Sequence, residues 1–573
     1  MSIGSFVFML HGHLPYYRKA GMWPFGEENV YECMAGSYIP LLDVIEELYN
    51  EGIKAKLTVG ITPILAEQLA DEHLNKGFEN YLETKIKAVS EDIERYPDPN
   101  VAHSQHLEYL AKFYYEWYTK IKDHYINRYN RNLIGAFKKY NDLGCIEVTT
   151  SAATHGFSPL LATETSLNAQ YRVGVETYKK FFGKNPKGCW LPECAYRPGY
   201  EATDQQGNKT YRPPIEVSLF NNNLEYFFTE SHVIEGGVSV GSRRVVGIYG
   251  NIEYIPLPSR PPTGLTTYEA YWMQGAQVAV MGRNDRAGFQ VWSAAHGYPG
   301  DGCYREFHKK DDKSGMNYWR ITSPTTDLGA KMLYDPVLAM NRIGENSDHY
   351  VDLVYHLLND YKNSTGKEGL IMVSFDAELF GHWWFEGLEW IKQIIKKLHE
   401  HIPSVQRRSA SEYLEEHKPS AAVTLPESSW GQGGHFWVWQ NHQTEWMWTI
   451  IHSAEYRMES IVEKFKEEKD PIKVRALNQL ARELLLLQSS DWPFLITTWQ
   501  ARDYATDRFL EHKDNFEKLA SQIENGQIDE SYLGYLEDKD NPFSHVDYKV
   551  YLKEAVPHLS ETANPVPSAT SNS

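Results

Sequence analysis

Seven short apolar segments recur along the first two thirds of the chain, and longer segments with helical periodicity lie between several of them. The apolar segments span residues 6–10, 55–61, 145–150, 188–191, 226–229, 277–281 and 370–375. Residues 40–50, 166–182 and 347–361 carry apolar side chains at the spacing of an amphipathic helix. Strands that alternate with helices are typical of a parallel sheet with crossover helices. The pattern therefore predicts an α/β barrel or an open doubly wound sheet.

Two intervals are too long to be simple connections within such a sheet. Residues 75–143 are charged, Tyr-rich and helical in pattern, which predicts an inserted helical subdomain. Residues 232–325 are rich in Gly, Pro and Arg, which predicts long loops of the kind that cover binding sites. Strand signals stop after about residue 405. We therefore expect the α/β domain at 1–405, a helical domain at 406–555 and a disordered Pro/Ser-rich tail at 556–573.

Charge and composition narrow the possible partners. The formal net charge is -19, which is unfavourable for binding the phosphate backbone of a nucleic acid. The 16 Trp and 38 Tyr suit stacking against sugar rings, although most of them are expected in a large core. Five cysteines in so long a chain make a disulfide framework improbable. No apolar run is long enough for a membrane span, so we expect a cytoplasmic protein, either a monomer or a small homo-oligomer.

Residues with reactive side chains follow several of the predicted strands directly. In parallel α/β folds, such groups meet at the carboxyl ends of the strands. No nucleophile elbow, P-loop or dinucleotide fingerprint is present. The residues at predicted strand ends are His11 and His13 after the first, His155 after the third, Glu193 after the fourth, and Asp376, Glu378 and His382 after the seventh.

The stretch GCWLPECAY, residues 188–196, allows three readings: half of a metal site, a redox pair, or a carboxylate held at a strand end. Structural zinc sites usually need two closely spaced cysteine pairs, and no second pair follows Cys189 and Cys194. Two cysteines five residues apart on a strand point to opposite sides. We therefore expect two buried free thiols, with Glu193 as the chemically relevant residue.

His11 and His13 are two residues apart, which places both on one face of a strand. That spacing suits a metal site, and it equally suits two imidazoles that line a polar pocket. Because no carboxylate or cysteine lies nearby in the sequence, the pocket is the favoured interpretation and no metal is expected.

Glu193 and Asp376 end two different predicted strands, beside Trp190, Trp383 and Trp384. Glycosidic bond cleavage needs one carboxylate as nucleophile or base and one carboxylic acid as proton donor. Either residue alone is more simply a hydrogen-bonded strand-end carboxylate. The pair with its tryptophans favours carbohydrate chemistry. Spacing alone leaves Glu378, Glu386 and Glu389 as rivals for the acid role.

Two further segments are rich in tryptophan. SSWGQGGHFWVW, residues 428–439, places Trp430, Trp437 and Trp439 beside a run of glycines and indicates an aromatic platform, although the pattern is equally compatible with one or two of them in the core. QSSDWPFL, residues 488–495, places Asp491 beside Trp492. Its two serines are of the type that caps a turn.

These motifs together resemble glycoside hydrolase family 57, and within it the 1,4-α-glucan branching enzymes. The matching blocks are HGHLPY (11–16), GITPIL (60–65), WLPECAY (190–196), SFDAELFGHWWFEG (374–387), SSDWPF (489–494) and VWSAAHGYPGD with YREFHK (291–301 and 304–309). They run from residue 11 to about 500, which is nearly the whole chain. The resemblance implies an incomplete (β/α)7 barrel with a helical insertion and a C-terminal helical domain, and it implies no cofactor.

The resemblance also implies roles for individual residues in a retaining reaction on α-1,4-glucan. Glu193 would be the nucleophile and Asp376 the general acid and base. The implied substrate-binding residues are Arg283, Gly300, Trp430, Asp491 and Gln500, with Trp23, Trp292 and Trp439 as stacking residues and His11, His13, His155 and His382 around them.

Three departures from the family pattern stand out. Ala377 follows Asp376 where we expect Thr, and residues 294–297 read AAHG where we expect an acidic residue. The loop tyrosine that favours transfer over hydrolysis in the family is either Tyr249 or Tyr254.

The alternative functions are an α-amylase or 4-α-glucanotransferase of the same family, a glucan-binding protein without activity, and a metal-dependent hydrolase that uses His11 and His13.

Overall fold

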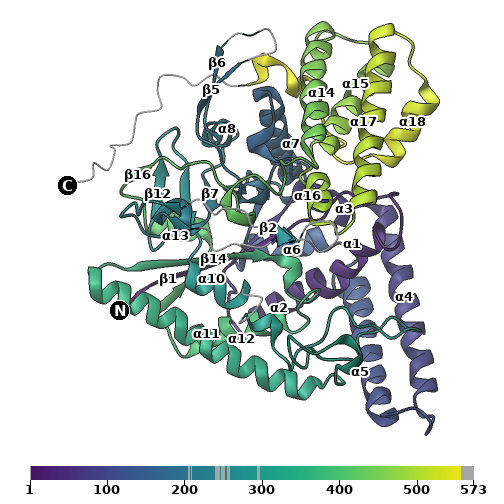
Figure 1. Cartoon of the computed structure of the whole chain (residues 1–573), viewed down its shortest axis with the longest axis vertical. Helices are drawn as coiled ribbons and strands as arrows, with labels where there is room; N and C mark the ends of the chain where they lie inside the picture. The colour runs from purple at the N-terminus through teal and green to yellow at the C-terminus, as the bar shows by residue number, and fades with distance from the viewer. Residues whose placement is uncertain are drawn as a thin grey trace.

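All seven predicted apolar segments form strands of one parallel sheet in this computed structural model (Figure 1). The structure describes residues 2–203, 207, 209–238, 245–246, 252–253, 259–292 and 297–556. The parallel strands are β1 (Gly4–Gly12), β2 (Leu57–Ile61), β3 (Ile146–Ser151), β4 (Gly188–Trp190), β7 (Tyr226–Thr229), β13 (Ala279–Gly282) and β14 (Gly369–Asp376). Their order in the sheet is β14-β1-β2-β3-β4-β7-β13.

The sheet curls into an incomplete barrel, which confirms the predicted fold class. Each neighbouring pair from β14 to β13 is parallel. At one edge the antiparallel strand β12 (Ala270–Met273) follows β13. All nine residues of β1 are buried, as expected for a central strand that is covered on both faces. The carboxyl ends of these strands therefore gather at one end of the barrel.

Helices cover the outside of the barrel. They are amphipathic: in α12, for example, Trp390, Ile391, Ile394 and Ile395 face the core and lysines face outward. The helices and short helical turns of this part are α1 (Glu27–Cys33), α2 (Ile39–Asn50), α3 (Pro63–Leu69), α6 (Leu133–Asp142), α7 (Glu164–Phe182), α8 (Ile215–Asn221), α9 (Ser231–Glu235), α10 (Asp285–Trp292), α11 (Pro336–Thr365), α12 (Gly387–Glu400) and α13 (Ala410–Glu416).

Two long helices stand at one side of the barrel, in the interval 75–143 where an insertion is expected. They are α4 (Glu72–Arg95) and α5 (Ser104–Asp123), and they pack side by side at the lower right of Figure 1. The third helix of the interval, α6, instead packs against β3 and α2 of the barrel.

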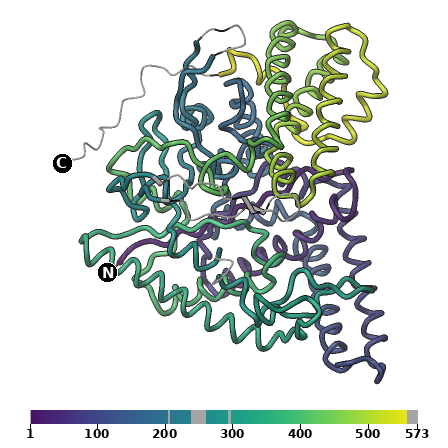
Figure 2. The backbone as a smooth tube through the Cα atoms, in the orientation of Figure 1, coloured from purple at the N-terminus to yellow at the C-terminus, as the bar shows by residue number. Residues whose placement is uncertain are grey.

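A bundle of helices follows the barrel and has its own hydrophobic core. Its members are α14 (Glu445–Lys464), α15 (Pro471–Leu487), α16 (Asp491–Thr498), α17 (Arg502–Asn525) and α18 (Glu530–Lys539). Leucines of α15 and phenylalanines of α17 are buried together. Figure 2 shows that these green to yellow helices meet the purple N-terminal segment at their lower end. There Tyr16 donates a hydrogen bond to the backbone oxygen of Lys539 at 3.0 Å.

The sheet continues past residue 405, where the sequence pattern indicates no strand. β15 (Val405–Arg407) pairs with β1, and β16 (Ala422–Val423) pairs with β12. Both strands are too short to give a periodicity signal, which explains why the sequence does not reveal them. Tyr249, Tyr254 and the predicted tail from residue 557 onward lie outside the described residues.

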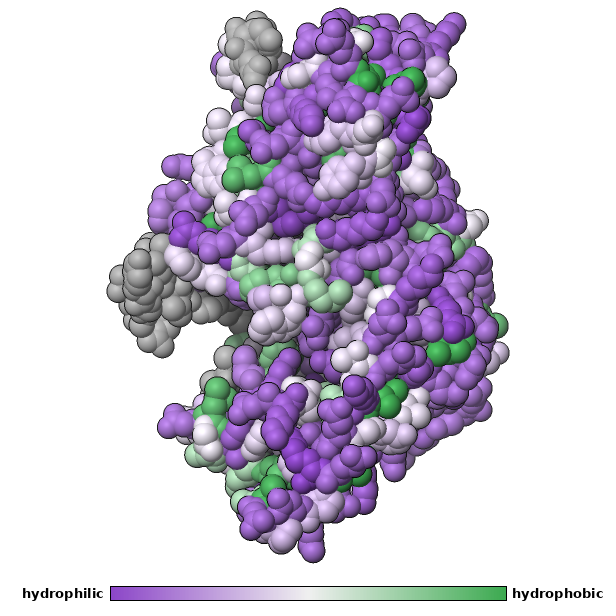
Figure 3. Space-filling view, turned by 90° about the vertical axis from the view of Figure 1, so that its right-hand side faces the viewer, coloured by the Kyte–Doolittle hydropathy of each residue, from purple (hydrophilic) through white to green (hydrophobic). Residues whose placement is uncertain are grey.

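The outer surface agrees with this layering. Hydrophilic residues cover most of the face shown in Figure 3, and hydrophobic residues form small separate groups. Among the described helices, none is both long enough and apolar enough to cross a bilayer.

Candidate active site

A cavity of about 430 Å³ opens where the strand ends meet the helical bundle. Nine of the residues expected at the site line it: His11, His13, His155, Glu193, Asp376, His382, Trp430, Asp491 and Gln500. They come from four strand ends, from the 428–439 segment and from the α16–α17 region of the bundle. Cavities with convergent polar groups of this kind are the usual location of a binding or catalytic site.

Glu193 lies in a single helical turn directly after β4, and its backbone geometry is unusual. Its φ is 59° and that of Cys194 is 51°, so both occupy the left-handed region that side chains disfavour. Such conformations cost on the order of 1–3 kcal/mol each and cluster at functional sites. The Glu193 carboxylate accepts hydrogen bonds from the Trp430 indole and the Ser490 hydroxyl, both at 2.9 Å. Cys189 and Cys194 are buried and free, as predicted.

Three histidines connect Glu193 to the helical bundle. His11 Nε2 and His155 Nε2 lie 3.1 Å apart, and His155 Nδ1 lies 3.0 Å from the hydroxyl of Ser490. Burial, helped by the charge of His13, lowers the pKa of both His11 and His155, so these two rings are neutral. They therefore act as hydrogen-bonding groups that fix the orientation of Ser490.

His13 differs from its neighbours because it faces a carboxylate. Its Nε2 lies 3.1 Å from both carboxylate oxygens of Asp491. Burial opposes a charge on His13, but the hydrogen bond and charge of Asp491, together with the charges of Glu193 and Glu378, raise the pKa of this histidine. A partly charged His13 in turn favours ionised carboxylates around the cavity.

Asp376 ends β14 and lies directly beside His11 in the sheet register. Burial, with the nearby Glu378 carboxylate as the second cause, raises the pKa of Asp376 to about 7. Glu378 also lines the cavity, and its Oε1 accepts hydrogen bonds from the His13 backbone at 3.1 Å and from the Tyr38 hydroxyl. Glu386 and Glu389, the other rivals for the acid role, do not line the cavity.

Hydrogen bonding distinguishes the two principal carboxyl groups, whereas burial does not. Burial also raises the pKa of Glu193 to about 7, against the effect of its bond to Trp430. Glu193 accepts two hydrogen bonds that stabilise its ionised form. In the described part of the chain no donor side chain contacts Asp376 in this way. The two bonds thus favour the ionised form of Glu193, and Asp376 has no such stabilisation, although burial raises the pKa of both groups to about 7.

Four of the expected residues do not line this cavity. Arg283 follows β13 and pairs with Glu230 at 2.8 Å, from where its charge acts on Asp376. Gly300 ends a short helical turn, and Trp292 ends α10 with its ring 6.3 Å from Phe375. Trp23 is 75% exposed on the loop before α1. Trp23 and Trp292 thus lie outside the cavity with partly or largely exposed rings.

Trp439 is not a stacking residue, contrary to the sequence-based expectation. It is 1% exposed, its ring stacks on Phe157 at 4.6 Å, and it belongs to the core of the helical bundle. The ring also fills the space beside Gly431, where an added Cβ would lie 2.5 Å from it. Trp439 therefore packs behind the 428–439 segment, whereas Trp430 lines the cavity and bonds Glu193 through its indole N–H.

Sequence reasoning missed two contributors. Ser490 is expected only to cap a turn, yet its hydroxyl bonds Glu193, 297 positions away in the chain. Tyr38, which bonds Glu378, lies in a π-helical turn between α1 and α2. Its position within an apolar helical pattern gives no local signal. The only sequence feature that could have marked Ser490 as a site residue is its position directly before Asp491.

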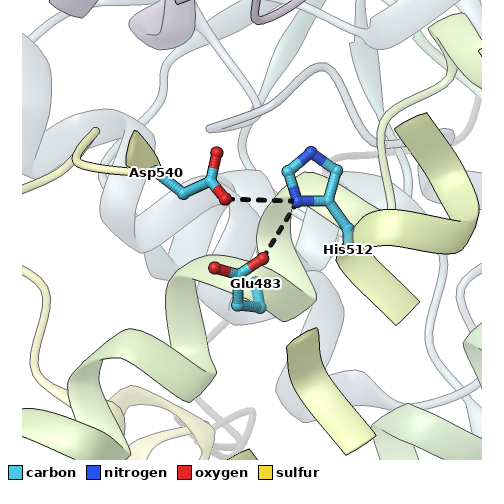
Figure 4. A group of neighbouring side chains, drawn as sticks. All are labelled: Glu483, His512 and Asp540. Carbon is cyan, nitrogen blue, oxygen red and sulfur yellow. Dashed lines mark hydrogen bonds and ion pairs between the residues drawn. The ribbon is translucent and has the colours of Figure 1, made fainter. Parts of the chain in front are cut away.

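A second cluster of titratable side chains lies in the helical bundle, away from the cavity. Glu483, His512 and Asp540 are fully buried and point toward one another in Figure 4. Arg508 can only donate, and its Nη2 lies 3.0 Å from His512 Nε2. That nitrogen therefore accepts, so His512 Nδ1 carries the proton and donates it to Glu483 at 2.9 Å. A protonated Nδ1 has no lone pair for a metal ion, and the cluster is better described as a hydrogen-bonded core group.

Comparison with known proteins identifies the family. A sequence profile described as glycosyl hydrolase family 57 matches residues 7–426, and one described as the C-terminal region of 1,4-alpha-glucan branching enzyme matches residues 450–551. A 1,4-alpha-glucan branching enzyme of Thermococcus kodakarensis is 44% identical over 567 residues, covering 98% of this chain and 80% of that protein.

Solved structures agree with these matches. A crystal structure of the Thermococcus enzyme in complex with glucose has a TM-score of 0.88 at 42% identity, covering 99% of this chain and all of that one. A Thermotoga maritima alpha-amylase has a TM-score of 0.80 at 32% identity, covering 96% of this chain and 99% of that one. The sequence match over most of the chain, together with the agreement of the whole fold, shows that the chain belongs to glycosyl hydrolase family 57.

Proposed function

We propose that the protein is a retaining 1,4-α-glucan branching enzyme, with Glu193 as nucleophile and Asp376 as general acid and base. One observation carries the assignment of roles: Glu193 is stabilised as a carboxylate by Trp430 and Ser490, while Asp376 lines the same cavity with a raised pKa. An ionised and a protonated carboxyl group in one buried site are what retaining glycosyl transfer requires.

In the first step, an oxygen of the Glu193 carboxylate attacks the anomeric carbon of an α-1,4-linked glucose. The bond between this carbon and the glycosidic oxygen breaks. Asp376 donates its proton to that oxygen, which leaves as the 4-hydroxyl of the departing chain. The products are a covalent glycosyl ester on Glu193 and an ionised Asp376.

In the second step, the ionised Asp376 takes the proton from a 6-hydroxyl of an acceptor glucan. The acceptor oxygen attacks the anomeric carbon and displaces Glu193, which forms an α-1,6 branch and restores both carboxyl groups. Water in place of the acceptor gives hydrolysis instead. The partly buried cavity and its aromatic wall favour the acceptor by limiting the access of water.

Two further features support this choice over an α-amylase. The C-terminal profile of branching enzymes matches residues 450–551, and the branching enzyme relative is more similar than the Thermotoga alpha-amylase. We expect the substrate to be an amylose-, glycogen- or starch-like chain, in keeping with a cavity that combines carboxyl groups and other hydrogen-bonding side chains with aromatic rings. We also expect a cytoplasmic monomer or small homo-oligomer.

The deciding experiment incubates the protein with amylose and follows three signals. A branching enzyme lowers iodine staining and creates α-1,6 proton NMR signals, with little increase in reducing ends. A rise of reducing ends in step with the loss of stain would instead identify an amylase. Glu193→Gln should abolish the loss of iodine staining and the α-1,6 signals, while the protein still folds and binds glucan. Glu389→Gln, outside the cavity, serves as the matched control.

A further inference from the structure

A groove of about 610 Å³ runs along one side of α17, outside the catalytic cavity. Its wall combines Lys19 and Ala20 of the N-terminal segment with one face of α17 and with Lys539 at the end of α18. The two cavities share no lining residue. The catalytic residues and the implied substrate contacts all lie elsewhere, so none of the roles assigned so far uses this groove.

The groove nevertheless continues the catalytic cavity along a single helix face. Gln500 and Ala501, at the start of α17, line the catalytic cavity. Tyr504, Arg508, Glu511 and Asn515 line the groove. From Ala501 onward these positions are three or four residues apart, which places them on one side of the helix. From Ala501 to Asn515 the helix axis rises about 21 Å, at about 1.5 Å per residue.

Tyr504 lines the groove, and its ring lies next to two residues of the catalytic cavity. Its ring lies 6.2 Å from Tyr17 and 5.8 Å from Phe25, and both of those residues line the catalytic cavity. The Tyr504 hydroxyl is buried and has no hydrogen-bond partner among the described residues. An aromatic ring with a free hydroxyl at the junction suits a ligand that passes from one cavity to the other.

The charges of the groove select a neutral polar ligand. Lys19, Arg508 and Lys539 are cationic, and Asp507, Glu511 and Asp514 are anionic, so the lining has no net formal charge. Arg508 is 4% exposed, and its Nε has no acceptor within the described part of the chain. Buried donors without a partner are costly, and a ligand that brings hydroxyl groups satisfies them.

We propose that this groove binds the part of an α-1,4-glucan chain that extends beyond the catalytic cavity. A glucan is neutral and polyhydroxylated, and it is long enough to follow the face of α17 from Gln500 to Asn515. The inference rests on the proposed function, because only a glucan enzyme delivers such a chain to this position. Chains that reach the groove gain contacts that shorter chains lack, so the groove favours long substrates.

The test measures glucan binding to the inactive Glu193→Gln protein by calorimetry, with amylose and with short malto-oligosaccharides as probes. Tyr504→Ala should weaken amylose binding about threefold to tenfold, with a smaller effect on the short probes. The double variant Asp507→Ala with Asp514→Ala changes only exposed groups of the groove. It should also lower the affinity for amylose relative to the affinity for the short probes, and it leaves the contacts of Tyr504 with Tyr17 and Phe25 unchanged. Tyr535→Ala, an exposed tyrosine of α18 outside the groove, is the control.

Each outcome is decisive. Loss of affinity for amylose in both groove variants, with Tyr535→Ala unaffected, supports the subsite. An amylose affinity that stays at the parent value in the double variant overturns it, whatever Tyr504→Ala does. Failure of the proposed function would give a different result. The unmodified protein would then form no α-1,6 bonds, whereas the affinities of the variants for amylose and for the short probes could still be measured.

Discussion

The indole nitrogen of Trp430 lies 2.9 Å from Oε2 of Glu193, and the backbone nitrogen of Trp430 donates to the backbone oxygen of Glu193 at 3.0 Å. Two residues 237 positions apart are therefore joined through both side chain and backbone. The contact ties the segment that follows the barrel to the turn after β4. It also holds the carboxylate in one orientation while its backbone keeps a disfavoured conformation.

Trp430→Phe replaces the indole by a smaller aromatic ring and removes the N–H donor. Hydrogen bonds to charged groups contribute about 1.5–3 kcal/mol, so kcat should fall on the order of 10- to 100-fold. Because this bond lowers the pKa of Glu193, its loss raises that pKa and moves the acidic limb of the pH–rate profile to higher pH. Steady-state branching rates across pH measure both effects. Trp437→Phe, in the same segment, is the control, and equal losses in the two variants would contradict a role for the bond.

Glu378→Gln tests how the proton is kept on Asp376. Glutamine retains an oxygen that can accept from Tyr38 and from the His13 backbone, so the local structure should persist. The negative charge beside Asp376 disappears, and that charge raises the pKa of Asp376. Asp376 must be protonated to act as the acid, so activity should be lost at a lower pH than in the parent protein. A profile that falls in height without moving its alkaline limb would show that Glu378 has only a structural role.

Most of the barrel is predictable from the sequence because its strands are buried on both faces. The apolar segments at 6–10 and 370–375, for example, lie within β1 and β14 with bounds off by at most two residues. The two strands after residue 404 that escape prediction, Val405–Arg407 and Ala422–Val423, have only three and two residues. Their pairing is decided by neighbours far away in the chain, and no local pattern records it.

The site is predictable only to the level of strand ends. Sequence order places Glu193 and Asp376 after strands, and the parallel topology brings such ends together. The contacts that separate their roles come from Trp430 and Ser490, whose positions depend on how the helical bundle docks on the barrel. The same docking buries Trp439, which lies in the same tryptophan-rich segment as the functional Trp430 but packs on Phe157.

Replacing Trp439 and replacing Trp23 should have different effects on stability, although both tryptophans are expected near the substrate. Trp439→Ala removes a ring that is 1% exposed and should lower the free energy of unfolding by about 3–5 kcal/mol. Trp23→Ala removes a ring that is 75% exposed and should change it by no more than about 0.5 kcal/mol. Denaturant titration measures both. A stability loss of similar size in the two variants would contradict the assignment of Trp439 to the core.

The buried cluster of Figure 4 predicts how stability depends on pH. Burial raises the pKa of Glu483 to about 7 and, with the Glu483 charge, that of Asp540 to about 6. Unfolded Glu and Asp have pKa values of about 4.3 and 3.9. Since both folded values lie above the unfolded ones, the folded state binds more protons. The contribution of this pair to stability should therefore be greatest at acidic pH and should decline as the pH rises from about 4 to about 7.

Asp540→Asn tests this dependence because neither carboxylate oxygen of Asp540 has a hydrogen-bond partner in the described residues. The amide that this substitution introduces can donate a hydrogen bond to Glu483, and it does not titrate. The variant should lose less of its free energy of unfolding between pH 5 and pH 8 than the parent protein, as measured by denaturant titration at each pH. Glu530→Gln removes an exposed acid of α18 and should leave the parent slope intact. If Asp540→Asn keeps the parent slope as well, the cluster is not the group whose protons stabilise the bundle.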